Sequence, residues 1–162
     1  MTLPRQPWVL LLVLATLLGG CLGPMPLPRA GLNRQLEQAG GNRDPSLGQN
    51  WLALIQQRGG RQQALLLDLK SERPVPLPGL NRPDALPISI SVDGSGERLA
   101  LVRQLEGRSE VVLYRRTAMS LQPIAMGAGA IPTAAVIRAD GRQLAVQVSR
   151  NGLWQIDLVD LP

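Results

Sequence analysis

The side chains that most often carry catalysis are scarce in this sequence. It contains no histidine and one cysteine, Cys21, so histidine-based triads are excluded and most zinc sites lack their ligands. The sole lysine, Lys70, is next to Ser71, but adjacency in the chain does not make a Ser–Lys dyad. Asp157 and Asp160 are three residues apart in an expected strand, so they point to opposite faces and do not form a carboxylate pair. We therefore expect no enzyme, no metal and no cofactor.

Cys21 follows a segment with the pattern of an export signal. Met1–Gly20 has one basic residue, Arg5, then an apolar run from Trp8 to Leu18 and two glycines. That run holds about eleven residues, whereas a membrane span needs roughly 20. It is typical of a signal peptide, which we assign to residues 1–20.

The sequence Leu18-Gly19-Gly20-Cys21 resembles the lipobox of bacterial lipoproteins. The resemblance implies cleavage between Gly20 and Cys21, and lipid on the Cys21 thiol and the new amino group. Two or three acyl chains hold a protein firmly to a membrane, whereas one alone is marginal. An ordinary signal peptide with an unrelated cysteine, or an uncleaved anchor, is the alternative. We expect an exported protein facing the periplasm, and Leu22 after the cysteine, in place of Asp, favours the outer membrane.

The next segment, residues 21–41, is expected to be a tether. Leu22–Ala30 contains three prolines and is expected to be extended. Gly31–Ala39 has Leu32, Leu36 and Ala39 on one helical face, and Gly40-Gly41 ends the helix. The globular domain then occupies residues 42–162.

Charge and aromatic content bear on the partner. Lysine and arginine number 17 against 12 acidic residues, and the arginines are dispersed along the chain. The export signal and the few aromatic residues argue against nucleic-acid binding by base stacking, because only Tyr114, Trp51 and Trp154 are aromatic after residue 20. A solvated basic surface, or attraction to acidic lipid or an acidic partner, remains open.

A repeat of about 45 residues organises the globular domain. Leu52–Ile55, Leu99–Val102 and Leu144–Gln147 are alike, and each is followed by a turn glycine and a second apolar run. The glycines are Gly60, Gly107 and Gly152, and the second runs are 64–69, 111–116 and 156–161. Two apolar runs joined by a glycine turn predict a β-hairpin. The copies occupy residues 42–79, 86–126 and 133–162.

The central runs are apolar on both faces, unlike a strand with one wet side. Stacked blades of a β-propeller need this pattern, since each sheet lies between two others. Ile88–Val92 and Ala135–Ala139 are expected as leading strands, and Val75–Leu77 and Leu121–Ala125 as trailing strands. We predict an all-β fold of about three four-stranded antiparallel blades, the first without a clear leading strand and the third without a trailing one.

Asp-Gly pairs precede two of the central runs. Asp93-Gly94 and Asp140-Gly141 are expected to form tight turns, in which glycine supplies a positive φ and Asp bonds nearby backbone. A calcium site needs several oxygens at fixed spacing, and each turn has one acid. We interpret all four residues as structural.

This pattern resembles the repeat of the TolB-type propellers. Asp93-Gly94 with Leu99–Val102, Asp140-Gly141 with Leu144–Val146, and Gly152–Asp160 carry the likeness, although Val92 and Ala139 stand where proline is usual. The resemblance implies a periplasmic β-propeller that acts through protein–protein contacts, as TolB does in the Tol–Pal system. No partner-binding residue carries over from it.

Three blades are one short of the usual smallest ring, because closed propellers have four to eight. Either the segment Gly31–Trp51 covers one end of the array, or two chains combine into a six-bladed homodimer. In the first case the sheet array stays partly open. In the second, a two-fold axis closes it.

Two classes of function follow. The protein is a binding module for another envelope protein, with the inter-blade loops Leu80–Pro87 and Gly127–Pro132 among its surfaces. Alternatively it is a structural envelope lipoprotein, or an accessory subunit of a transport system, without a binding pocket of its own. Gly127–Gly129 is not a phosphate loop, because Pro132 interrupts where a helix would follow.

Overall fold

The structure, a computed structural model, describes residues 25–162. The expected signal peptide, the cleavage site at Gly20 and the lipidated Cys21 lie outside the described residues. Among the described residues, no helix is long and apolar enough to cross a membrane. Residues 31–162 form one unit, and the account below concerns it.

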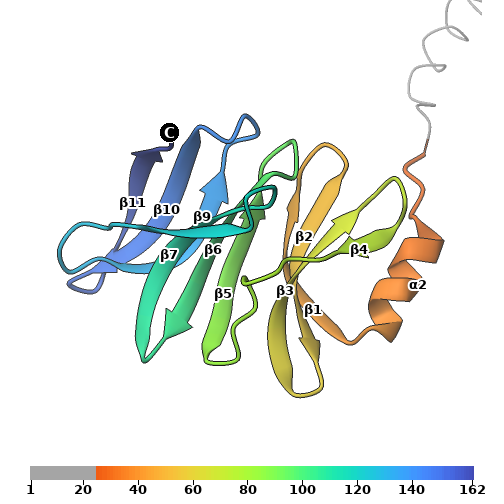
Figure 1. Cartoon of the computed structure of the whole chain (residues 1–162), viewed down its shortest axis with the longest axis horizontal. Coiled ribbons are helices and arrows are strands. Elements are labelled where there is room, and N and C mark those ends of the chain that lie inside the picture. The colour runs from red at the N-terminus through yellow and green to blue at the C-terminus, as the bar shows by residue number, and fades with distance from the viewer. Residues whose placement is uncertain (1–24) are drawn as a thin grey trace, which may run out of the picture. The chain divides into compact units, whose positions relative to one another are not determined.

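Three antiparallel sheets lie side by side (Figure 1), and in each the strand order follows the chain. Sheet 1 contains β1 (Gly41–Leu47), β2 (Trp51–Arg58), β3 (Arg61–Asp68) and β4 (Arg73–Val75). Sheet 2 contains β5 (Ala85–Val92), β6 (Arg98–Leu105), β7 (Arg108–Arg115) and β8 (Ser120–Ile124). Sheet 3 contains β9 (Ile131–Ile137), β10 (Gln143–Arg150) and β11 (Leu153–Asp160). The predicted all-β fold of three blades is confirmed.

Each sheet is built on a central hairpin with a two-residue turn. Both turn residues have positive φ in all three hairpins, as a type I′ turn requires. The pairs are Gly59-Gly60 (φ 57° and 78°), Glu106-Gly107 (51° and 76°) and Asn151-Gly152 (51° and 79°). The turn glycines that the repeat singled out therefore lie where the chain needs them.

The central strands bury side chains on both faces. Leu99 and Leu101 of β6 pack in a cluster with Ile55 of sheet 1, while Ala100 and Val102 pack with Leu144 of sheet 3. All six side chains are at most 2% exposed. Stacking of sheet 2 between its neighbours accounts for the absence of a polar face in this strand.

A helix covers the outer face of sheet 1. Helix α2 (Ala30–Gln38) places Leu32 in a buried cluster with Leu54 and Leu67, and Leu36 packs against the same cluster. Each of these strand residues points away from sheet 2. The expected helix is present, and it covers one end of the sheet array, as the first of the two alternatives required.

Sheet 1 has a leading strand, which the sequence did not predict. Strand β1 (GNRDPSL) pairs with β2 across an irregularity between Arg43 and Ser46, and Asp44 has a φ of 54°. It has few apolar residues, and its polar side chains Asp44 and Ser46 accept hydrogen bonds from the backbone of β5. The prediction of a missing strand was therefore wrong for blade one, while sheet 3 does end with three strands.

Two expected strands are displaced toward their prolines. Strand β9 begins at Ile131 and ends at Ile137, before the expected 135–139 segment finishes, and β4 lies at Arg73–Val75. Pro132 and Pro74 are accepted in these strands because both are edge strands, where an N–H can be dispensed with.

Candidate functional site

Neighbouring sheets are joined by side chains of their leading strands. Asp44 Oδ2 accepts a hydrogen bond from the Ile90 N–H, and Ser46 Oγ accepts one from the Val92 N–H at 3.1 Å. These bonds tie β1 to β5. An edge strand thus finds acceptors for N–H groups that have no strand partner on that side.

The same connection joins β5 to β9. Ser89 Oγ accepts from the Ala135 N–H at 3.4 Å, and Ser91 Oγ accepts from the Ile137 N–H at 3.1 Å. Both serines are at most 5% exposed. We call the bonds made by Asp44, Ser46, Ser89 and Ser91 the side-chain ladder.

The ladder stops at sheet 3. Val136 pairs with Ala145 as Ser91 pairs with Ala100, so Val136 occupies the serine position without its hydroxyl. One position earlier in the ladder, Ala134 replaces Ser89. A further blade stacked in the same way would find no acceptors here.

The Asp-Gly turns also lie at the junctions between sheets. The Gly94 N–H donates to Ala139 O at 2.8 Å, and the Gln49 N–H donates to Gly94 O at 3.2 Å. A Cβ at Gly94 would stand 2.8 Å from Ala139 O, which explains the glycine. In the second turn Gly141 has the expected positive φ, 72°. In the first turn the residue with positive φ is Gly96, at 70°, and not Gly94. The expectation of a positive φ at Gly94 was therefore wrong.

Asp93 organises its own turn. Its Oδ1 accepts from the Glu97 N–H at 3.0 Å and from Ser95 Oγ at 3.1 Å, and its side chain is buried. Asp93 therefore holds backbone and a neighbouring hydroxyl, the bonding typical of a structural turn residue.

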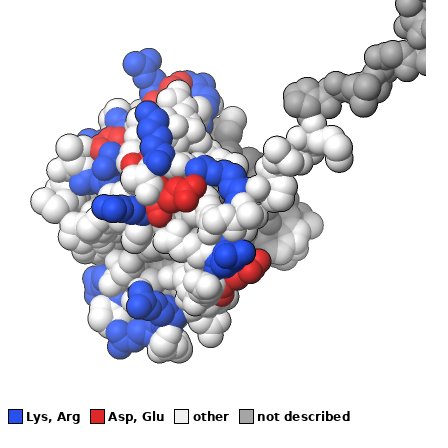
Figure 2. Space-filling model, turned by 90° about the vertical axis from the view of Figure 1, so that its right-hand side faces the viewer, with Lys and Arg blue, Asp and Glu red and all other residues white. Residues whose placement is uncertain are grey.

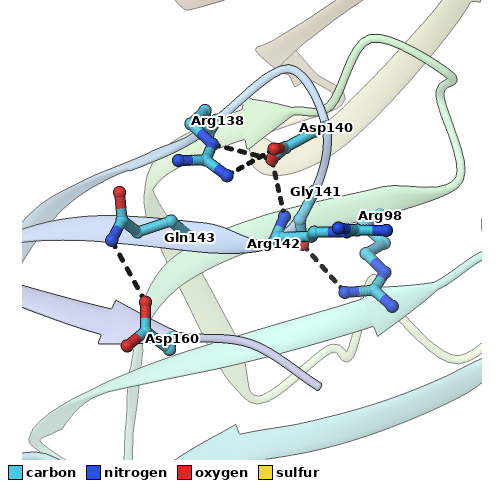
Figure 3. Close-up of polar contacts among 7 residues, drawn as sticks. All are labelled: Arg98, Arg138, Asp140, Gly141, Arg142, Gln143 and Asp160. Carbon is cyan, nitrogen blue, oxygen red and sulfur yellow. Dashed lines mark hydrogen bonds and ion pairs between the residues drawn. The ribbon is translucent and has the colours of Figure 1, made fainter.

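Asp140 lies in a polar group at the junction of sheets 2 and 3 (Figure 3). Arg138 Nε donates to its Oδ1 at 2.9 Å, and the Arg142 N–H donates to the same oxygen at 2.9 Å. The Arg138 guanidinium, followed by the Arg142 N–H, lowers the pKa of Asp140 to about 2. Arg98 spans the junction, donating to Gly141 O at 2.8 Å and to Pro162 O at 2.7 Å.

The outer face of sheet 3 is apolar and, within the described residues, has no helix or strand packed on it. Five large side chains stand on this face, each between 57% and 69% exposed: Ile131, Val136, Trp154, Ile156 and Leu158. Strand pairing places them on one face, since Val136 and Leu158 both lie opposite Ala145. Gln147 and Ser149 of β10 lie on the same face, opposite Ile156 and Trp154. We call the five apolar residues the open face. Large exposed apolar side chains gathered on one face are typical of interaction sites.

The three aromatic residues expected outside the signal peptide have different surroundings. The Arg116 guanidinium lies 4.7 Å from the centre of the Trp51 ring. Tyr114 is buried and donates its hydroxyl to Pro78 O at 3.0 Å, and burial raises the pKa of that hydroxyl. Trp154 is 66% exposed on the open face. On the face that Figure 2 shows, basic and acidic side chains lie side by side over the upper part, and several basic ones gather at the lower left.

The two inter-blade loops differ in what they form. Residues 81–86 line a hollow of about 310 Å³ together with Gln57 and residues 60–63. Asn81 anchors this loop, because its side chain bonds both the N–H and the carbonyl of Ala64 at 2.7 Å and 2.9 Å. Residues 127–130 form a turn, in which the Ala130 N–H donates to Gly127 O at 3.1 Å.

The residues considered above for catalysis do not form a common site. Ser71 Oγ donates to Asp68 Oδ2 at 3.0 Å. Asp157 is paired with Arg150, and Asp160 accepts from Gln143 at 3.1 Å on the other face of β11. Among the described residues, no three Cys, Asp or Glu side chains are grouped as metal ligands.

Comparison with known proteins places this geometry among the propellers. No protein-family model matches the sequence, and no curated protein is similar to it. Among solved structures, TolB from Acinetobacter baumannii is 14% identical to this chain with a TM-score of 0.57. The alignment covers 72% of this chain and 29% of the TolB chain. A protein assigned as TolB from Agrobacterium tumefaciens is 11% identical with a TM-score of 0.59, over 78% of this chain and 48% of its own.

The propeller domain of the Trilobed protease from Pyrococcus furiosus is also similar, at 15% identity and a TM-score of 0.53, over 74% of this chain and 38% of that one. The chain thus spans less than half the length of each. Its fold is a TolB-like β-propeller fold, present as three blades. At these identities the likeness concerns the fold alone.

Sequence reasoning expected that an open array would expose apolar blade faces and strand edges, but it did not identify the residues of the open face, and it missed the side-chain ladder. The strand gave the opposite signal for the open face, because Trp154, Ile156 and Leu158 alternate with Gln155 and Asp157. Such alternation indicates that the apolar side is covered. In the structure these three apolar side chains are the exposed ones. The ladder gave a weaker signal, since isolated serines in a strand have many roles.

Proposed function

We propose that this protein is a lipid-anchored binding module of the bacterial cell envelope that faces the periplasm and holds another envelope protein on its open face. The observation that carries the proposal is the contrast between the two ends of the array. Helix α2 covers the outer face of sheet 1, whereas large apolar side chains stand uncovered on sheet 3. Large exposed apolar side chains gathered on one face are typical of protein-binding surfaces.

Lipid on Cys21 would supply the attachment, preferentially to the outer membrane. The lipobox-like residues 18–21 support this part of the proposal, and the TolB-like fold supports a role like that of TolB with a partner of the Tol–Pal system. The test is metabolic labelling with a fatty acid. We expect label on the native chain, recovered in the outer-membrane fraction, and no label on C21S; a labelled C21S chain would contradict the proposal.

We propose binding in place of catalysis. The same fold occurs in a domain of a protease, so the fold leaves the question open. The side chains weigh against catalysis, since the sequence has no histidine and Ser71 is bonded to Asp68 in a turn.

Site-specific photo-crosslinking in intact envelopes tests the binding role. A photo-reactive residue is placed at Ile131 or Val136 on the open face, and at the exposed Glu37 on α2 as the matched control. We expect one defined protein to be captured from the two face positions and not from Glu37. A Tol–Pal component would support the TolB-like role.

Three results would count against it. Capture at all three positions alike would mean chance contact. Recovery of peptidoglycan alone would favour the structural lipoprotein, and capture of a transport protein would favour the accessory subunit.

A further inference from the structure

The outer edge of sheet 3 is unlike the outer edges of the other two sheets. Sheet 1 ends in β4, which has 3 residues and contains Pro74, and sheet 2 ends in β8, which has 5 and contains Pro123. Short strands with proline are poor templates for another strand. The sheet edges at β4 and β8 are therefore protected against pairing.

Strand β11 has none of this protection. It has 8 residues, LWQIDLVD, with neither proline nor lysine. Among residues 25–162 it pairs with β10 alone, so its other edge presents unpaired backbone N–H and carbonyl groups along the whole strand. A long edge strand with a row of large apolar side chains is a template for a further strand.

We propose that β11 pairs antiparallel with β11 of a second copy of this chain, across a two-fold axis. The two third sheets then join into one sheet that runs through both copies. An antiparallel contact of a strand with itself is isologous, so each copy supplies the same donors and acceptors and the interface closes after two. This inference goes beyond the binding role proposed above and does not depend on it.

The side chains select a register for the pairing. Both open faces must lie on the same side of the joined sheet, so residues of equal parity face each other. With the axis at Ile156, that residue lies opposite its own copy, and Trp154 lies opposite Leu158 of the second copy. These cross-strand pairs are all apolar, and directly opposite apolar pairs stabilise an antiparallel sheet.

Charge distinguishes this register from its neighbours. With the axis at Ile156, Asp157 faces the amide of Gln155 of the second copy. Moving the axis to Asp157 would place two aspartates directly opposite, which is destabilising. Moving it to Gln155 would place Asp157 opposite the apolar Leu153. Of these three positions, Ile156 alone avoids both.

The structure also weighs against the six-bladed ring considered from the sequence. A ring would require sheet 3 of one copy to stack on the outer face of sheet 1 of the other, where Leu32 of α2 already lies in a buried cluster. The ladder is also absent there: Pro45 stands where Ile90 of sheet 2 donates its N–H, and Val136 replaces the acceptor serine. Edge pairing leaves α2 and the open face as they are.

Disulfide trapping tests the dimer and its register. The full chain in detergent is oxidised mildly in three variants, Q155C, I156C and D157C. The native chain is the control, since any disulfide that it forms must come from Cys21. In the proposed register residue 156 lies directly opposite its own copy, at a Cβ separation that a disulfide can bridge, whereas the two copies of residue 155, or of residue 157, lie on a diagonal and are too far apart. We therefore expect about tenfold more disulfide-linked dimer from I156C than from the other two variants. The double variant W154C/L158C should also link.

Equal linking at all three positions would mean random collision, and a maximum at another position would refute the register. Solution mass supplies an independent readout. After the mass of the bound detergent is subtracted, we expect the native chain to have the mass of a dimer. We expect I156K to have the mass of a monomer, because a dimer would bring two ammonium groups together on the axis. The matched control is V136K, on the same face but two strands away, which should stay dimeric.

A native monomer would overturn the proposal. Because V136K changes the open face and leaves the edge intact, loss of the photo-crosslinked partner in a dimeric V136K would separate the two proposals. A monomeric native chain that still captures its partner would leave the binding role standing and remove the dimer.

Discussion

At the scale of single residues, the close approach of neighbouring sheets depends on a position without a side chain. The Gly94 N–H donates a hydrogen bond to Ala139 O, and a Cβ added at Gly94 would stand 2.8 Å from that backbone oxygen. We expect G94A to lower the free energy of unfolding by about 1–3 kcal/mol, because sheets 2 and 3 must separate slightly. Urea unfolding followed by circular dichroism measures it. The control is G31A in helix α2, where a Cβ meets nothing within 4 Å and a gain of about 0.5 kcal/mol is expected.

The side-chain ladder has a matched pair of positions with opposite expectations. S91A would leave the buried Ile137 N–H without its acceptor, so we expect a loss of about 1–3 kcal/mol in the free energy of unfolding. V136S changes the equivalent residue of sheet 3, which is 64% exposed, and should change stability by less than about 0.5 kcal/mol. Chemical unfolding of both variants checks this. A V136S loss as large as that of S91A would mean that Val136 is packed against something and is not exposed.

Asp140 provides a pH dependence with a defined sign. Its pKa in the folded chain, about 2, is below the ordinary value of 3.8, because Arg138 and the Arg142 N–H stabilise the charged carboxylate. A lowered folded pKa means that this stabilisation is fully present above about pH 4 and is lost as the pH falls through 2. Carbon-13 NMR of the carboxyl group should give a midpoint near 2, moving upward in R138Q. A midpoint unchanged in R138Q would assign the shift to another cause.

At the scale of elements, α2 holds sheet 1 through a small number of leucines. Leu32 is 5% exposed and lies against Leu54 and Leu67, so L32A removes the centre of that contact. We expect a loss of about 2–3 kcal/mol, since the cavity on one side of a helix collapses in part. Hydrogen exchange should accelerate in β2 and β3 more than in β10. L27A, at a residue 87% exposed, is the control and should change neither quantity.

The elements differ in how far the sequence predicted them. The central hairpins were predictable because Leu99–Val102 and its copies are apolar on both faces and end at glycine turns, a pattern set by local chemistry. Strand β1 was not, because Asn42, Arg43 and Pro45 resemble a loop and become a strand only through pairing with β2. Tertiary pairing of this kind leaves no mark in the strand's own residues.

The candidate site was less predictable than the fold. The strand containing Ile156 and Leu158 was expected, yet its exposure depends on which sheets stack on it, a property of the whole array. The role of Gly94 was misassigned because its requirement comes from Ala139, which is distant in sequence. Lipidation of Cys21 rests on the sequence pattern and stays a prediction.

At the scale of the whole molecule, the array has two different ends. One outer face carries α2, while the open face at the other end has no helix or strand of residues 25–162 packed on it, so a second copy cannot stack end to end without displacing the helix. A contact between unlike ends is heterologous, and such contacts form rings or growing filaments. The helix thus restricts association to the open face and the β11 edge.

Removing that restriction gives the last prediction. In L32D/L36D the helix can no longer cover Leu54 and Leu67, so both ends of the array become available. We expect species larger than the dimer, with a mass that rises with protein concentration in light scattering, because apolar sheet faces of this size associate. Adding V136K, which places a charge on the open face, should suppress them and thereby identify that face as the second participant. Native-like circular dichroism together with an unchanged mass in L32D/L36D would show that α2 does not limit the assembly.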